Sequence, residues 1–72
     1  MNPAQVRMAR AALNWKLVDL EKASGVHRNT ISNYETEKYG GTEATLIAIR
    51  EALEAAGVEF TNGDQPGVRL KK

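Results

Sequence analysis

Apolar residues recur at helical spacing near the start of the chain. Val6, Ala9 and Leu13 lie three and four positions apart, so they share one face of a predicted helix over about residues 3–13. The preceding Asn2-Pro3-Ala4-Gln5 combines a favourable N-cap, a proline in the first turn and a glutamine at the position of a capping box. The pattern therefore predicts a well-capped first helix.

Two shorter helices are predicted next, on either side of a tight turn at Gly25. The first starts near Leu17, and the second covers about residues 28–35. Glycine readily adopts the left-handed backbone that a sharp reversal requires, so these elements predict a helix-turn-helix over residues 17–35. The apolar residues expected to pack between the helices or to fill their corner are Leu20, Ala23, Val26, Ile31 and Tyr34.

A longer helix is predicted after a glycine-containing loop. Thr42 is suited to cap this helix, which is expected to continue until Gly57 ends it. Leu46, Ile49 and Leu53 share one of its faces. This fourth helix is the most regular of the set.

The segment at about residues 58–70 predicts a β-hairpin, because apolar and polar residues alternate on both sides of a turn-rich stretch. A two-stranded hairpin alone is only marginally stable in water. Its apolar face must therefore pack on the helices, or the hairpin must extend into a sheet with a second copy of the chain. The residues of that face are Val58, Phe60, Val68 and Leu70. The sequence leaves both arrangements open.

Composition agrees with one small globular domain that covers residues 1–72. The chain is 42% hydrophobic and 26% charged, close to the average for such a domain. It has no cysteine and hence no disulfide, so a core this small favours additional support from dimerisation. No apolar run suits a signal peptide or a membrane span, so we expect a cytoplasmic protein without a membrane partner. With one histidine and no cysteine, no metal site is expected.

Charge is distributed unevenly along the chain, although the net charge is only +1. Residues 1–34 carry five basic and two acidic side chains, whereas residues 35–64 carry two basic and seven acidic ones. A basic N-terminal half suits contact with phosphate, and the acidic middle is the part least suited to it. Ordinary solvated faces would give similar counts, so charge alone leaves both interpretations open.

The predicted third helix has two distinct faces, because each residue advances the helix by about 100°. Ile31 and Tyr34 anchor one face to the rest of the protein. The opposite face presents side chains that can read base edges in the major groove, namely Arg28, Asn29, Ser32 and Asn33. Any surface helix is polar outside, but the adjacent tight turn and the apolar spacing favour DNA reading over that simpler explanation.

Three segments, Arg7–Trp15, Leu20–Glu35 and Ala44–Phe60, resemble the Cro/repressor-type (Xre) helix-turn-helix regulators of bacteria and phages. The tail Gly67–Leu70 also resembles these regulators, so the resemblance covers nearly the whole chain. It implies a mainly α fold, a compact four-helix DNA-binding domain of the phage-repressor type, here with a C-terminal β-hairpin. It also implies a homodimer that acts on a two-fold symmetric operator.

The same resemblance implies a structural ion pair between Arg10 and Glu35, and it marks three departures from the family pattern. Lys16-Leu17 stands where the family usually has a capping serine and a phosphate-binding glutamine. Glu21 stands where a small alanine usually lies between the two helices, so it must tilt outward or pair with a cation such as Lys22 or Arg28. His27 replaces a capping serine, and it is expected to cap the third helix, contact a phosphate or remain exposed.

These observations lead to the hypothesis of a sequence-specific DNA-binding regulator, expected to be a repressor. Its homodimer would place two copies of helix 28–35 in successive major grooves about 34–36 Å apart. The side chains expected near phosphates are Arg7, Lys16, Lys22, His27 and Lys38. Enzyme signatures are absent, and no cofactor or small-molecule ligand is expected. The alternative is a protein-interaction module or antitoxin that retains the fold with weak or no DNA binding.

Overall fold

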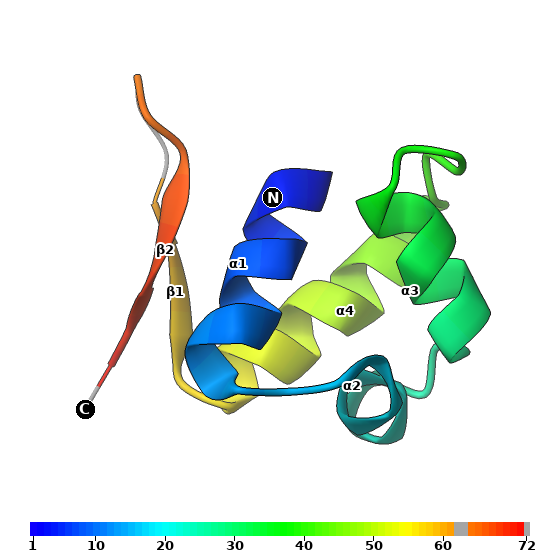
Figure 1. Ribbon diagram of the computed structural model, residues 1–72, viewed down its shortest axis with the longest axis horizontal. Coiled ribbons are helices and arrows are strands. Elements are labelled where there is room, and N and C mark those ends of the chain that lie inside the picture. The colour runs from blue at the N-terminus through cyan, green and yellow to red at the C-terminus, as the bar shows by residue number, and fades with distance from the viewer. Residues whose placement is uncertain (62–63, 72) are drawn as a thin grey trace.

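Four helices and one hairpin follow the order expected from the periodicity. The computed structural model describes residues 1–61 and 64–71. The elements are α1 (Pro3–Leu13), α2 (Leu17–Ser24), α3 (Arg28–Glu35), α4 (Glu43–Ala55), β1 (Val58–Thr61) and β2 (Gly67–Leu70), as Figure 1 shows. These bounds agree with the sequence-based expectations. The mainly α fold with a C-terminal hairpin is therefore confirmed.

Polar caps define the ends of the helices. The Asn2 side chain accepts a hydrogen bond from the Gln5 backbone N–H at 2.8 Å, and the Gln5 side chain accepts one from the Asn2 N–H at 2.9 Å. This reciprocal capping box satisfies two donors that the first turn of α1 would otherwise leave unpaired. Thr42 caps α4 in the same way by accepting from the Thr45 N–H at 3.2 Å.

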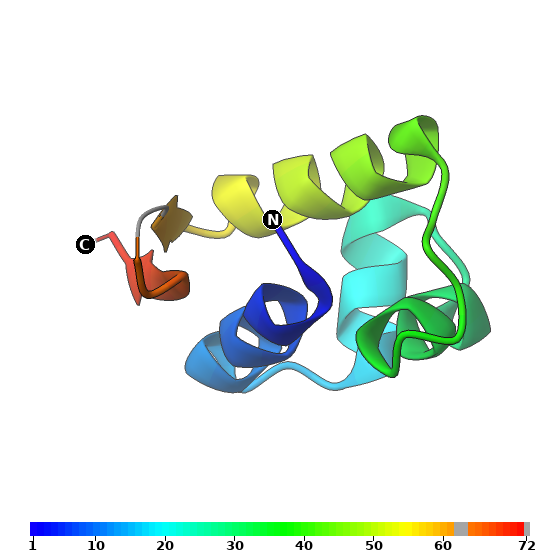
Figure 2. The same ribbon diagram turned by 90° about the horizontal axis from the view of Figure 1, so that it is seen from above.

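The hydrophobic core lies where the four helices and the hairpin meet. α2 packs against both α3 and α4, while α1 packs against α3 and β2. Figure 2 shows this arrangement of elements from above, with α3 at one end of the molecule and the hairpin at the other. The buried apolar residues are Val6, Ala9, Leu20, Ile31, Tyr34, Ile49, Ala52, Leu53 and Val58.

One predicted packing position in the helix-turn-helix is wrong. Ala23 was expected to face the partner helix, but its side chain is exposed. The buried face of α2 is centred on Leu20, and Ala23 lies in the last turn of the helix, beyond that contact. Val26 is half-buried against the core, as a residue that fills the corner should be.

The two strands pair with each other within the chain. β1 and β2 are antiparallel, with Phe60 opposite Val68 and Val58 opposite Leu70. Val58 is buried, and Phe60 and Val68 are half-buried against the core. Leu70 departs from the prediction, because it is 39% exposed at the open end of the hairpin. The hairpin therefore obtains its support mainly from packing on the helices.

Gln5 ties the hairpin to the first helix. Its side-chain amide donates to the backbone carbonyls of Thr61 and Gly67, each at 3.0 Å. These two residues face each other at the turn end of the hairpin. Gln5 is 1% exposed, and its oxygen already accepts in the capping box, so this buried amide has every hydrogen-bonding group satisfied at the α1–hairpin junction.

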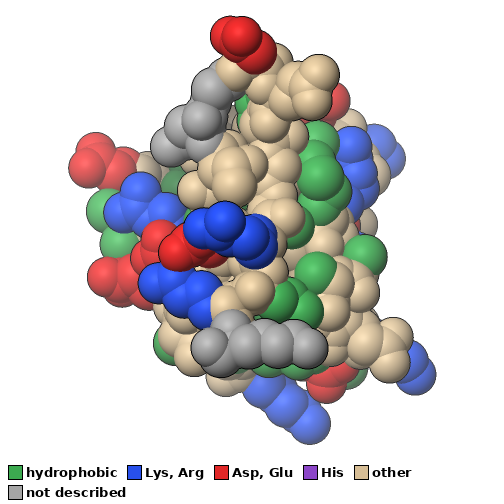
Figure 3. Space-filling view, turned by 90° about the vertical axis from the view of Figure 1, so that its left-hand side faces the viewer, with side chains coloured by type: hydrophobic (Ala, Val, Ile, Leu, Met, Phe, Trp, Pro, Cys, Tyr) green, Lys and Arg blue, Asp and Glu red, His purple; other side chains and the backbone are tan. Residues whose placement is uncertain are grey.

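The outer face of the hairpin carries charged side chains. Arg69 on β2 donates two hydrogen bonds to the Glu59 carboxylate on β1, and Lys71 lies 3.4 Å from the same carboxylate. The hydrogen bonds from Arg69 are the main cause of a lowered pKa of Glu59. Basic and acidic side chains meet on this side of the molecule in Figure 3.

Candidate nucleic-acid interface

A three-residue turn joins α2 to α3. Gly25 ends α2 in the left-handed conformation at φ +76°, and its N–H donates to the Glu21 carbonyl at 2.9 Å. The Ser24 hydroxyl accepts from the Val26 N–H at 3.1 Å and so fixes the next peptide of the turn. His27 then caps α3, since its Nδ1 accepts from the Asn29 N–H at 3.0 Å. Two of the alternatives for His27 therefore hold together: it caps α3, and it is exposed.

The two faces of α3 separate as the helical rotation predicts. Ile31 is fully buried and Tyr34 is 5% exposed, so both anchor the helix, and burial raises the pKa of the Tyr34 hydroxyl. Arg28, Asn29 and Asn33 are exposed on the opposite face. The fourth residue proposed for base contact, Ser32, is half-buried. Three exposed polar side chains therefore share one helical surface.

Glu21 reaches this surface from the neighbouring helix. Its carboxylate lies 3.4 Å from the guanidinium of Arg28, at the start of α3. The Arg28 side chain is 55% exposed, so the ion pair holds it loosely at the rim of the interface. Of the alternatives for Glu21, the structure shows pairing with a cation, and that cation is a candidate base-reading residue.

The basic residues expected near phosphates occupy different elements. Lys16 lies immediately before α2, Lys22 lies in its last turn, and Lys38 follows α3; all three side chains are exposed. The aspartate of the first turn of α2, Asp19, accepts from the Lys16 backbone N–H at 2.8 Å. Arg7 differs from the lysines, because its guanidinium donates to the Glu35 carbonyl at the end of α3.

Comparison with known proteins identifies the family. A family model described as helix-turn-helix matches residues 6–60, which include all four helices except the first residues of α1 and extend through most of β1. The chain is a Cro/repressor-type (Xre) helix-turn-helix protein. This is a family of DNA-binding regulators, not of enzymes. Neither the curated proteins nor the solved structures contain a match.

The Xre protein contains the ion pair that the resemblance implied. Arg10 on α1 donates from Nε to one Glu35 oxygen at 2.6 Å and from Nη2 to the other at 2.7 Å. Its remaining Nη1 donates to the Trp15 carbonyl at 3.1 Å. The hydrogen bond to Glu35 is the main cause of a raised pKa of Arg10. Glu35 is 4% exposed, so the pair fixes the end of α3 and is not available to DNA.

Within the described residues the structure shows neither a cluster of metal ligands nor a membrane-spanning helix. No group of three His, Asp or Glu side chains within residues 1–61 and 64–71 could hold a metal ion. Over the same residues, no helix is long and apolar enough to cross a membrane.

Sequence reasoning identified the polar face of α3 and included the Glu21–Arg28 pair among its alternatives, but it missed the contact from Arg7. The bond from Arg7 to the last turn of α3 has no signature in the periodicity, because it links residues 28 positions apart through a backbone carbonyl. The role of Glu21 toward Arg28 was one of several alternatives, since a distance of seven residues across a turn is decided only by the angle between the helices.

Proposed function

We propose that this protein is a sequence-specific, cytoplasmic transcriptional repressor that binds duplex DNA as a homodimer and inserts α3 into the major groove. The observation that carries the proposal is the exposed polar face of α3, which lies opposite the buried Ile31 and Tyr34. A helix anchored in this way can present side chains to base edges without disturbing the core. A protein seated at a promoter would then exclude the transcription machinery.

Arg28 and the asparagines of α3 are proposed to read bases. Arginine can donate two hydrogen bonds to guanine, and asparagine can form a bidentate pair with adenine, each worth about 1–3 kcal/mol of discrimination. Asn29 and Asn33 lie about one turn apart, so they can address neighbouring base pairs. Ser32 is half-buried and has a short side chain, so it would contribute a contact of shorter reach.

Exposed lysine, arginine and histidine side chains around α3 are proposed to contact the phosphates on either side of the groove. Such contacts orient the protein on the duplex and supply affinity that falls as salt rises. The side chains given this role are Arg7, Lys16, Lys22, His27 and Lys38. For Arg7, a phosphate would have to share the guanidinium with the Glu35 carbonyl.

The base-reading assignment is tested by selection from a random duplex pool. Wild-type protein is expected to enrich a defined sequence, and Arg28→Ala and Asn33→Ala are each expected to relax it at different positions. Arg69→Ala serves as the matched control, because Arg69 is an exposed arginine on the hairpin at the opposite end of the molecule. If neither α3 variant alters the selected sequence, α3 does not read bases as proposed.

A second function is supported by Glu21, which brings a negative charge to the face that DNA would approach. A protein-interaction module or antitoxin with weak DNA binding would accommodate that charge. The two functions differ in salt dependence. A DNA regulator loses duplex affinity with a logarithmic slope of about −0.9 per phosphate neutralised, whereas an interaction module binds duplex weakly at every salt concentration.

A further inference from the structure

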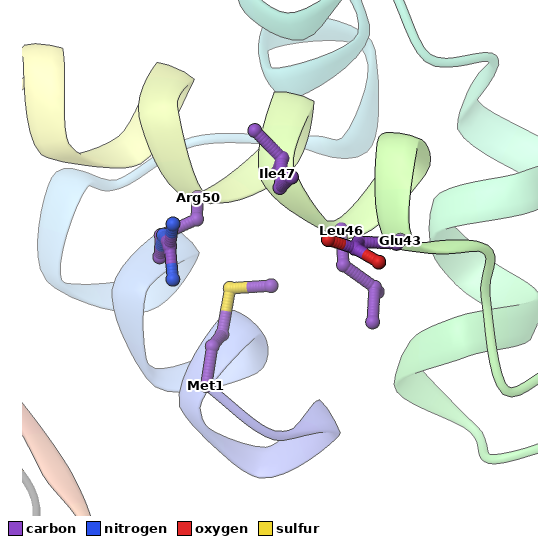
Figure 4. Close-up of a pocket in the computed structure, with 5 residues that line it drawn as sticks. All are labelled: Met1, Glu43, Leu46, Ile47 and Arg50. Atoms are coloured by element: carbon purple, nitrogen blue, oxygen red, sulfur yellow. The ribbon is translucent and has the colours of Figure 1, made fainter.

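A shallow cavity of about 410 Å³ lies on α4, away from the polar face of α3. Met1 borders it on one side, and its other lining residues all come from the first two turns of α4, as Figure 4 shows. These are Glu43, Leu46, Ile47 and Arg50. The cavity is therefore a groove along one face of a helix, with an apolar middle and charged ends.

The apolar middle is open to solvent. Ile47 is 37% exposed, and it is one of three large hydrophobic side chains in the described residues with that degree of exposure. A large aliphatic side chain beside a groove leaves apolar surface in contact with water. Covering that surface with another protein surface is favourable. Glu43, Ile47 and Arg50 occupy helical positions i, i+4 and i+7, so they lie on the same face of α4.

The two charges are arranged symmetrically around the apolar middle. Glu43 and Arg50 have opposite signs and stand at equal distances in sequence from the midpoint between Leu46 and Ile47. Figure 4 shows them at opposite ends of the groove. Neither forms an ion pair with another residue of the part of the chain that the structure describes. Such a pattern is self-complementary under a two-fold rotation.

We propose that this face of α4 binds a second copy of the same chain through antiparallel packing of the two α4 helices. Ile47 then packs against its equivalent across the two-fold axis. Glu43 of each copy meets Arg50 of the other, so both charges of each groove are satisfied at once. This inference rests on the proposed homodimeric function, because it names the surface that forms the dimer.

The outer edge of the hairpin is less suited to this role. Arg69 in β2 and Lys71 directly after it are both basic, so an edge-to-edge pair of two β2 strands in a register that sets these residues opposite each other would place like charges across strands, which is unfavourable. The first turns of α4 also lie at the same end of the molecule as α3 in Figures 1 and 2.

The test uses reversed charges on two separate variants. In Glu43→Arg the groove has two positive ends, and in Arg50→Glu it has two negative ends. Each variant alone is expected to dimerise about 100-fold more weakly than wild type, because two like-charged contacts replace two ion pairs. An equimolar mixture is expected to form a heterodimer, since every contact across its axis then joins opposite charges. Sedimentation measures these masses against the 7.9 kDa monomer.

Glu51→Arg is the matched control, because Glu51 is exposed on α4 but does not line the groove. It is expected to dimerise as the wild type does. A wild-type monomer at all concentrations, or single variants that dimerise normally, would overturn the α4 interface. A mixture that remains monomeric would overturn it as well. Circular dichroism melting shows that each variant is folded.

Duplex binding is measured in parallel, so that failure of the interface and failure of the proposed function can be distinguished. A monomeric wild type that still selects a DNA sequence refutes only the interface. A dimer that shows the charge complementation but selects no sequence refutes the DNA function and leaves the interface intact. Sequence selection together with complementation supports both.

Discussion

Arg10 and Glu35 form a bidentate ion pair between α1 and the last turn of α3. The Glu35 carboxylate is buried, while Arg10 remains partly accessible. Because Arg10 also holds the Trp15 carbonyl, one side chain connects the end of α1, the loop after it and the end of α3. The orientation of α3 therefore depends on a contact made with another helix.

Removing one partner of this pair is expected to destabilise the protein strongly. Arg10→Ala leaves a buried carboxylate without its cation, which costs about 3–5 kcal/mol of the free energy of unfolding. Urea denaturation measures this loss. Arg69→Ala, which breaks the exposed pair with Glu59, is the control and is expected to leave the unfolding midpoint nearly unchanged. Equal losses in the two variants would contradict the structural role of Arg10.

Replacing Gln5 is expected to release the hairpin. Gln5→Leu preserves bulk but leaves the Thr61 and Gly67 carbonyls without their donor, at a cost of roughly 2–4 kcal/mol in unfolding free energy. Amide hydrogen exchange should show loss of protection concentrated in β1 and β2. The exposed amide in the turn, Gln65, provides the control Gln65→Leu, which is expected to have little effect on either measurement.

The cap formed by His27 is expected to support α3. His27→Ala removes the acceptor of the Asn29 N–H and should lower the unfolding free energy by about 1 kcal/mol. His27→Asp supplies a better acceptor at the same position, so its stability should equal or exceed that of wild type. Thermal unfolding compares the three proteins. An Asp variant as unstable as the Ala variant would refute the capping role.

The contact between Glu21 and Arg28 is expected to affect DNA binding more than stability. Glu21→Gln removes a negative charge that would repel the phosphates, so duplex affinity should rise, and the gain should be largest at low salt, where charges are screened least. Discrimination at the base pair read by Arg28 should weaken, because the side chain is less well oriented. Titrations at several salt concentrations measure both. Glu54→Gln, an exposed change on α4, should alter neither.

Most of the fold followed from local signals in the sequence. Asn2 and Thr42 begin helices where capping chemistry predicts, and Gly25 has the left-handed backbone expected between α2 and α3. Ala23 and Leu70 were predicted to pack inside but are exposed. The helical and strand periods indicate on which face a residue lies, but not how far the neighbouring element extends over that face. The extent of the contact between two elements is decided by tertiary packing.

The candidate site was predictable to a smaller extent. The rotation of α3 identified Arg28, Asn29 and Asn33 as exposed, since that depends only on helix geometry. It did not reveal that Arg7 bonds to the Glu35 carbonyl. Nor did the pattern of α4 indicate an interface, because Glu43, Ile47 and Arg50 look like an ordinary solvated face until the groove beside Met1 is seen.

The hydrogen bonds of Gln5 also have a consequence for the order of folding. They join positions 56 and 62 residues apart, so they can form only after nearly the whole chain has collapsed. The helices depend mostly on contacts between residues close in sequence, so they can form early. The hairpin is only marginally stable by itself, so it becomes stable only after it packs on α1. Mutations at Gln5 should therefore mainly accelerate unfolding and leave the refolding rate almost unchanged.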